Sequence, residues 1–403
     1  RIVSESSRAP TERKKELLMV SGETFNILPA DAENAQLVAR VWDPESGGPR
    51  VCRVVGDELV DITAQVPTVS ELAEQPHRVE ELGRGSGPKW SIEEVMKGSG
   101  SGDPGVPHFL APIDLQVTKA CGVTFVGSLI ERVIEEKGGG DIAKADALRK
   151  ELSDVLGGSL KGVSPGSDSA KKAKEILIEQ GLWSAYLEVG IGPDPEVFTK
   201  APVLASVGWG SLIGIPGFSQ WNNPEPELVL LINSLGHAVG AMLGNDVNLR
   251  DVEGRSSLLL GKAKDNNAQS ALGPFVRFFD SQFTLDTVAE EEIHLRVEGE
   301  DGFLMTGTNN VAEISRPLEE LIGATWGVHH QYPDGFALYT GTLFAPTQDR
   351  GEPGSGFTHH SGDRVIISSA HMGTLENTTA PTESLAPWNF GIRDLMRYLS
   401  RHS

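Results

Sequence analysis

The sequence predicts a β-rich α+β protein, with a small N-terminal β-rich domain and a helical insertion in a larger C-terminal domain. Short β-branched and apolar runs fill residues 37–63 and recur from residue 203 to the end, separated by glycine and proline. Such runs between turn residues are typical of antiparallel sheets. Residues 131–195 instead place their apolar side chains at helical spacing. The two kinds of pattern alternate along the chain, which predicts a β-rich body interrupted by helices.

The N-terminal region predicts a separate small domain. Residues 37–63 read as a three-stranded antiparallel meander, because turn residues divide them into three β-branched runs. We place the domain boundary at residue 112, so that residues 17–112 form the small domain and residues 113–403 form the catalytic one. Residues 1–16 are polar and of mixed charge, with no apolar core. We expect them to be a disordered or tag-like end.

The helical insertion, about residues 131–195, is expected to cover the catalytic domain as a lid. Its first helix follows Phe125 and ends at the glycines of residues 138–140. A second helix is expected over residues 143–156 and a third over residues 169–189. The second and third helices have polar outer faces, which is typical of helices that pack on one side only.

The composition excludes several classes of function. The chain has 35 Lys and Arg against 56 Asp and Glu, a net charge of −21, so most of its surface repels nucleic acid and anionic membranes. Its longest apolar run, residues 228–232, is far shorter than the roughly 20 residues of a membrane-spanning helix. The two cysteines form no C-x-x-C pair, which is typical of a reducing compartment. We expect a cytoplasmic protein with no nucleic-acid or membrane partner.

Two acidic segments form the strongest candidate site. Glu225 and Glu227 open a nearly all-apolar strand, and alternation places both carboxylates on one face. An E-x-E pair alone is more often a solvated face, but like charges beside a buried strand are costly unless a cation lies between them. The returning strand of the expected hairpin ends near Asp246, which can supply a third carboxylate. Three oxygen ligands without a thiolate favour a hard cation, Mg²⁺ first and Mn²⁺ or Ca²⁺ next.

Four motifs around these residues resemble those of the fumarylacetoacetate hydrolase superfamily. The family's H-x-E-x-E strand resembles residues 223–227, and its N-D-x-x-x-R-D turn resembles residues 245–251. Its K-(x)8-G-P stretch resembles residues 264–274, and its T-G-T piece resembles residues 340–342. Order and spacing agree from about residue 122 to residue 363, which makes the resemblance specific.

The resemblance implies a fold and a metal. The family fold is a twisted β-roll with a separate small N-terminal domain. Its chemistry uses Mg²⁺ or a similar ion to hold a 2-oxo acid through the carboxylate and the ketone. Carried over to this chain, the resemblance makes Glu225, Glu227 and Asp246 the metal ligands.

The same resemblance implies the substrate contacts. Lys264 becomes a cation beside the developing enolate, and Thr342 becomes an anchor for the substrate carboxylate. Gly341 and Asn245, which belong to these motifs, are expected at the substrate-binding site. The family's frequent dimers imply a homodimer or a higher homo-oligomer.

One departure from the family bears on the reaction. Hydrolytic members carry G-x-N-Y-x-x-H-x-x-E before the lid, and their His and Glu activate the water that cleaves a carbon–carbon bond. The matching residues 122–131 keep Glu131 but have Ser128 at the histidine position. A serine cannot act unaided as a general base near neutral pH. Hydrolysis therefore loses its main support.

The sequence predicts a hydro-lyase. Its long motifs resemble those of 2-keto-3-deoxypentonate dehydratases, which implies conversion of a 2-keto-3-deoxypentonate to 2,5-dioxopentanoate in pentose degradation. Glu131 is the first candidate for moving a proton, and Ser128 for orienting a water; their alternative roles are a helix-start carboxylate and an N-cap. A C–C hydrolase of a diketo acid is the alternative function. A non-catalytic metal-binding structural protein is least favoured, because a scaffold needs neither Lys264 nor Thr342 beside the ion.

Overall fold

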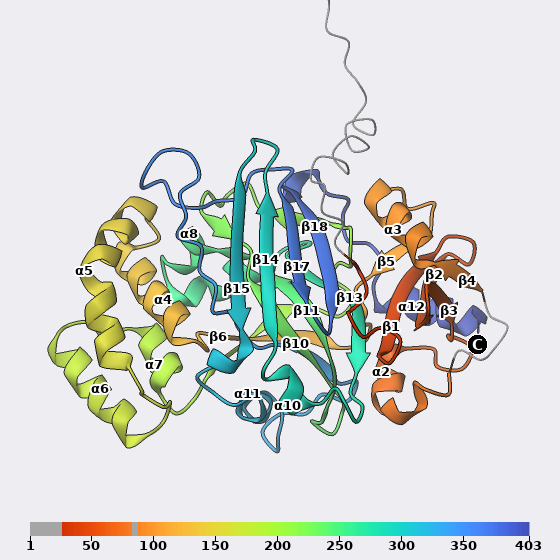
Figure 1. Cartoon of the computed structure of the whole chain (residues 1–403), viewed down its shortest axis with the longest axis horizontal. Helices are drawn as coiled ribbons and strands as arrows, with labels where there is room; N and C mark the ends of the chain where they lie inside the picture. The colour runs from red at the N-terminus through yellow and green to blue at the C-terminus, as the bar shows by residue number, and fades with distance from the viewer. Residues whose placement is uncertain (1–25, 83–87, 403) are drawn as a thin grey trace, which may run out of the picture.

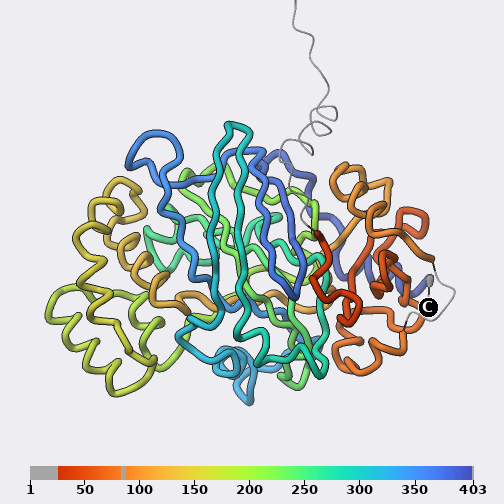
Figure 2. Tube along the Cα trace, in the orientation of Figure 1, coloured from red at the N-terminus to blue at the C-terminus, as the bar shows by residue number. Residues whose placement is uncertain are grey.

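A computed structural model describes residues 26–82 and 88–402 of the chain (Figure 1). The expected disordered end, residues 1–16, lies outside these ranges. The trace in Figure 2 shows the β-rich body at the centre, with a helical group at one end and the N-terminal strands at the other. In the described ranges, no helix is both long and apolar enough to cross a membrane.

The largest sheet has eleven strands and carries the candidate site. Most neighbouring strands are antiparallel, although β16 and β6 run parallel. Across the sheet the strands are β4 (Lys89–Ser91), β3 (Glu58–Asp61), β2 (Gly48–Val55), β1 (Gln36–Asp43), β13 (Ser270–Phe278), β11 (Ala238–Asp246), β10 (Pro226–Ile232), β16 (Phe336–Tyr339), β6 (Val117–Gly122) and β7 (Glu196–Ala201), with β5 (His108–Leu110) paired to β1.

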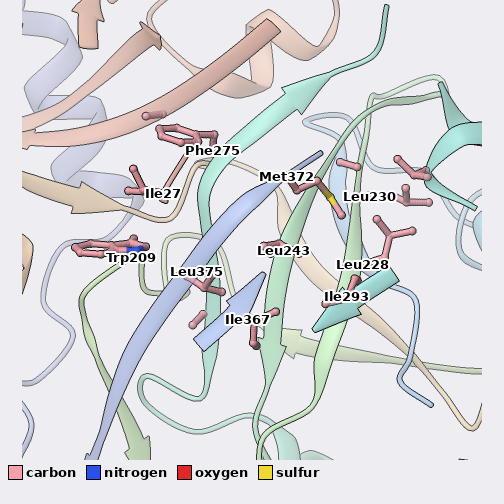
Figure 3. Close-up of a cluster of buried hydrophobic side chains, with 14 of the residues drawn as sticks. Ile27, Trp209, Leu228, Leu230, Leu243, Phe275, Ile293, Ile367, Met372 and Leu375 are labelled. Carbon is pink, nitrogen blue, oxygen red and sulfur yellow. The ribbon is translucent and has the colours of Figure 1, made fainter. Parts of the chain in front are cut away.

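Smaller sheets complete the body. The five strands of the second sheet are, in order, β15 (Leu304–Asn310), β14 (Glu292–Glu298), β17 (Arg364–Ser369), β18 (Gly373–Pro381) and β8 (Leu212–Ile215). A two-stranded ladder joins β9 (Asn222–Asn223) to β12 (Asn248–Leu249). Figure 3 shows side chains of both large sheets meeting in one core, among them Leu230 and Leu243 from the first sheet and Ile293 and Ile367 from the second.

The unbroken apolar run of β10 results from burial on both faces. Leu228, Leu230 and Ile232 enter the core between the two large sheets. Val229 and Leu231 point to the other face and enter a second core. A strand buried on both faces has no solvent-facing positions, so it loses the apolar and polar alternation of a half-exposed strand.

The N-terminal meander of β1, β2 and β3 is confirmed by their antiparallel pairing. β1 also pairs with β13 over Gln36 to Val38, so the meander continues the large sheet of the body. The domain boundary proposed at residue 112 remains a prediction. The β-rich mixed α/β class is confirmed.

The helical insertion consists of α4 (Val126–Gly138), α5 (Ile142–Leu160), α6 (Asp168–Glu179) and α7 (Ala185–Ile191). These helices form a group at one end of the molecule (Figure 1). The prediction of one helix over residues 169–189 is wrong, because the helix ends after α6 and a second helix, α7, follows. Gly181 adopts a positive φ of 68°, and the Ser184 side chain caps the start of α7.

The other helices lie mostly in the connections between strands. They are α2 (Val69–Ala73), α3 (Ile92–Ser101), α8 (Arg250–Glu253), α9 (Leu260–Lys264), α10 (Leu285–Val288), α11 (Leu318–Thr325) and α12 (Ile392–His402), with 3-10 turns η1 (Pro76–Arg78), η2 (Ser257–Leu259), η3 (Val311–Glu313) and η4 (Thr382–Ser384).

Candidate active site

The β10–β11 hairpin brings the three predicted carboxylates together. Glu225 immediately precedes β10, Glu227 is its second residue, and Asp246 is the last residue of β11. The backbone N–H of Asp246 donates to the carbonyl of Glu225 at 3.0 Å, so the two ends of the hairpin are aligned. Each residue offers one carboxylate oxygen, and these oxygens all lie within 4.8 Å of one another. We call Glu225, Glu227 and Asp246 the carboxylate triad.

Two buried lysines neutralise part of this charge. Lys264, at the end of α9, contacts Glu225 Oε2 at 2.5 Å and Asp246 Oδ2 at 3.0 Å through its Nζ. Lys200, in β7, contacts Asp246 Oδ1 at 2.8 Å and donates to the backbone carbonyls of Val247 and Lys264. Burial alone would raise the pKa of Asp246, but Lys200 and Lys264 together lower it. Asp246 is therefore held as an anion.

Among the described residues, none forms an ion pair with Glu227 as the lysines do with Asp246. Glu227 Oε2 accepts the backbone N–H of Gly341 at 2.7 Å, and only 1% of the residue is exposed. Burial, followed by the charges of Asp246 and Glu225, raises the pKa of Glu227 well above its ordinary value. An anionic carboxylate here needs a further positive charge, which a divalent cation bound by the triad would supply. The all-oxygen donor set suits Mg²⁺ or a similar hard ion.

The predicted substrate-binding residues lie next to the triad. Gly341 contacts Glu227 as described and has a φ of +94°, a conformation that favours glycine. Its neighbour Thr342 is 6% exposed, and its hydroxyl accepts the N–H of Phe344 at 3.1 Å. Asn245 accepts the N–H of Glu225 through Oδ1, while its buried Nδ2 has no hydrogen-bond partner within residues 26–82 and 88–402. An unpaired buried amide donor is available to a ligand oxygen.

Glu131 and Ser128 are both on α4. Glu131 contacts Arg149 Nη2 at 2.9 Å and Arg250 Nη2 at 3.4 Å, so in the described ranges its ion pairs are with arginines. The Ser128 hydroxyl donates to the Phe125 carbonyl at 3.0 Å, at the start of the helix. The alternative roles considered for them are wrong, because Phe125 is the N-cap of α4 and Glu131 lies beyond its first turn. Their catalytic roles remain predictions.

Sequence reasoning did not select Glu196, which the structure places near the triad. Glu196 begins β7 and pairs with Gly122 in the β6–β7 ladder. A Cβ on Gly122 would lie 1.8 Å from Glu196 Oε2, so the glycine leaves room for the carboxylate. Burial, with Glu253 next, raises the pKa of Glu196 to about 7, although Lys264 and Arg132 act to lower it. A carboxylate with this pKa can exchange protons near neutral pH.

Lys200 was also missed. It lies only four residues after Glu196, in the run Glu-Val-Phe-Thr-Lys. A charged residue at each end of a short apolar run is usual for an exposed edge strand, so the run by itself gave no reason to select them. The lysine is instead 1% exposed, because its ammonium contacts Asp246.

Two curated proteins are similar to this chain. A probable 2-keto-3-deoxyxylonate dehydratase of Haloferax volcanii is 31% identical over 200 residues, which are 50% of this chain and 65% of that protein. A 2-dehydro-3-deoxy-D-arabinonate dehydratase of Saccharolobus solfataricus is 32% identical over 184 residues, or 45% of this chain and 57% of that protein. The chain is a relative of these sugar-acid dehydratases. The predicted resemblance is thereby confirmed.

The match covers less than two thirds of the length of either dehydratase. No protein-family model matches the chain. Two solved structures of 2-keto-3-deoxy-D-arabinonate dehydratase, the apo form and a complex with magnesium and 2,5-dioxopentanoate, each align with a TM-score of 0.60. Each alignment covers 86% of this chain and 99% of the other, at 20% identity. This structural likeness shows a shared fold.

Proposed function

We propose that this chain is a metal-dependent hydro-lyase that converts a 2-keto-3-deoxypentonate to 2,5-dioxopentanoate. The observation that carries the proposal is the buried carboxylate triad with the Lys264 ammonium between Glu225 and Asp246. The relatives are named as dehydratases of such sugar acids, which supports the substrate class. Because the match covers only part of these relatives, the activity of this chain is proposed from both the site and the similarity.

The triad would hold Mg²⁺, Mn²⁺ or Ca²⁺, which, when bound, supplies a Lewis acid for the 2-oxo acid. Lys264 stabilises negative charge that develops on the enolate oxygen, because its buried ammonium is already held in place by Glu225 and Asp246. Thr342 anchors the substrate carboxylate beside Gly341, and the free Nδ2 of Asn245 donates to a substrate oxygen. Thr342 follows Gly341, whose N–H contacts Glu227, and Asn245 precedes Asp246, so these assignments use residues next to the triad.

Elimination requires a base at C3 and an acid at the C4 oxygen. We propose Glu196 as the base, because its carboxylate lies near Lys264 and its pKa of about 7 matches neutral conditions. Removal of the C3 proton gives the enolate, whose electrons then form the C3–C4 double bond as the C4–O bond breaks, and the departing hydroxide takes a proton to leave as water. Glu131, through a water oriented by Ser128, remains the candidate acid. The resulting 5-hydroxy enone then isomerises to 2,5-dioxopentanoate: protons are lost from C5 and from its hydroxyl, and solvent protons are added at C3 and C4.

The decisive experiment is incubation with Mg²⁺ and a panel of 2-keto-3-deoxy sugar acids and acylpyruvates. We expect 2,5-dioxopentanoate without chain cleavage, with solvent deuterium at the carbons that are protonated after elimination. The matched control is the same mixture with a chelator. Formation of pyruvate plus a two-carbon fragment would contradict the proposal. Rapid cleavage of an acylpyruvate would instead support the diketo-acid hydrolase.

A further inference from the structure

One arginine of the helical insertion contacts the carboxylate triad directly. Arg132 lies on α4, and its side chain is 12% exposed. Its Nη2 forms a short ion pair with Glu225 Oε1, and its Nη1 contacts Glu135 at 2.7 Å and Glu253 at 3.3 Å. In the part of the chain that the structure describes, no other residue of α4 to α7 forms an ion pair with the triad. Arg132 therefore connects the insertion to the candidate metal ligands.

The contacts of Glu225 show what this connection does. Glu225 Oε1 faces Arg132, Oε2 faces Lys264, and the backbone N–H donates to Asn245 Oδ1. Cations from two separate elements, α4 and α9, thus fix the rotation of one carboxylate. Second-sphere partners of this kind orient metal ligands, and their loss commonly weakens metal binding.

The ion pairs continue from Arg132 into the insertion. Glu135 contacts Arg250 Nη2 at 2.6 Å, and Arg250 in turn contacts Glu131, which pairs with Arg149 on α5. Arg250 is 1% exposed and lies over the Trp221 ring at 4.4 Å. The network therefore runs without interruption from a triad carboxylate to the second helix of the insertion.

We propose that Arg132 is a positioning residue, which orients Glu225 for the cation and makes cation binding and docking of α4 mutually dependent. A cation that holds Glu225 in place provides Arg132 with a fixed partner, and by linkage a docked α4 favours cation binding to the same extent. A guanidinium is required because three carboxylates approach from different directions, which the single ammonium of lysine cannot match. This inference rests on the metal site of the proposed function.

The first test measures Mn²⁺ affinity by electron paramagnetic resonance for the parent, R132K and R132M. Loss of orientation should weaken Mn²⁺ binding about tenfold in both variants. A role of charge alone would have a different signature, because R132K would then match the parent and R132M would bind Mn²⁺ more tightly. That pattern, or unchanged affinity in both variants, would overturn the proposal.

The second test measures hydrogen exchange of α4 and α5 with and without Mn²⁺. We expect Mn²⁺ to slow exchange in α4 of the parent but not of R132K, a response that a purely structural arginine would not produce. R149M is the matched control, because it breaks the Glu131 pair at the far end of the network without touching Glu225. Its Mn²⁺ affinity should stay within about twofold of the parent.

The outcomes separate this inference from the proposed function. A parent protein that does not bind Mn²⁺ would overturn the metal site itself. A parent that binds Mn²⁺ with no change in α4 exchange would overturn only the role of Arg132. Because R132M removes one ion-pair partner from each of three carboxylates, its fold is checked by circular dichroism, and R132K decides the test if R132M does not fold.

Discussion

Glu227 is the triad member whose charge is least compensated by protein groups. Substitution by Gln keeps the shape but removes the anionic ligand, so we expect Mn²⁺ affinity to fall at least about tenfold and dehydratase activity to be lost. Isothermal titration calorimetry measures the affinity. E292Q is the control, because the Glu292 side chain is 57% exposed on β14. Full activity of E227Q in chelator-treated buffer would rule out the triad as the metal site.

Lys264 tests whether the ammonium acts on the transition state. If it stabilises enolate charge, K264M should lower kcat by about 10² to 10³ and change KM much less. Steady-state kinetics with a 2-keto-3-deoxypentonate gives both constants. K262M is the matched control, since Lys262 is an exposed lysine of the same helix, over the Phe218 ring. An effect on KM alone would make Lys264 a simple anchor.

Glu196 gives the site an expected pH dependence. A base must be deprotonated to act, so with a pKa of about 7 the rate should rise about tenfold per pH unit below pH 7 and level off above it. E196Q should lower kcat strongly and remove this limb of the profile. The exposed Glu188, substituted as E188Q, should leave it unchanged. A parent profile that is flat from pH 5 to 8 would exclude Glu196 as the base.

The site residues that could be predicted from the sequence are those whose relative positions are fixed by one hairpin. Glu225, Glu227 and Asp246 could be predicted because alternation and a short turn fix their relative positions. Glu196 and Arg132 could not, because each reaches the site through tertiary packing of elements far apart in the chain. Glu131 shows the converse: its motif position was evident, but its partners Arg149 and Arg250 were not.

At the level of secondary structure, the β6–β7 pairing allows the position of the Glu196 carboxylate to be tested without substituting Glu196 itself. In G122A the new Cβ would lie 1.8 Å from Glu196 Oε2, so the carboxylate must move away. We expect activity to fall about tenfold or more, because small displacements of a catalytic group are costly. The thermal midpoint is measured in parallel to show that the fold is retained.

G158A is the control for this substitution. A Cβ on Gly158 meets no atom within 4 Å, and replacing a helical glycine by alanine stabilises a helix by up to about 1 kcal/mol. It should therefore keep full activity. Equal activity of G122A and the parent would show that the Glu196 carboxylate is not needed in its present position.

The strands that were predicted and those that were missed differ in how strongly their own sequences favour a strand. The hairpin of β10 and β11 was evident, since β10 is apolar throughout. β18, with the sequence Gly-Thr-Leu-Glu-Asn-Thr-Thr-Ala-Pro, has little apolar character and was missed. It is fixed by its neighbours β17 and β8 instead. A strand held mainly by its position in a sheet has a weak local signal.

On the scale of the whole molecule, the two ends of the described chain pack together. The Tyr398 ring of α12 lies against Gly48 of β2, where a Cβ would be 2.2 Å from the ring, and its hydroxyl is 3.1 Å from Ser46 Oγ. Because Tyr398 is only 5% exposed, Y398A should cost about 3 kcal/mol of unfolding free energy. Urea unfolding measures this. M396A is the control, since Met396 is 66% exposed, and an equal cost for both would contradict the packing role.

The pairing of β1 with β13 has a consequence for how the protein loses its structure. The second core contains Val38 and Leu72 from the N-terminal meander region together with Leu231 and Ala337 from the body. Because the two groups share this core, exposing either one to water also exposes the other. We therefore expect the meander and the large sheet of the body to unfold as one cooperative unit, so that a destabilising substitution far from the carboxylates lowers the folded fraction of both.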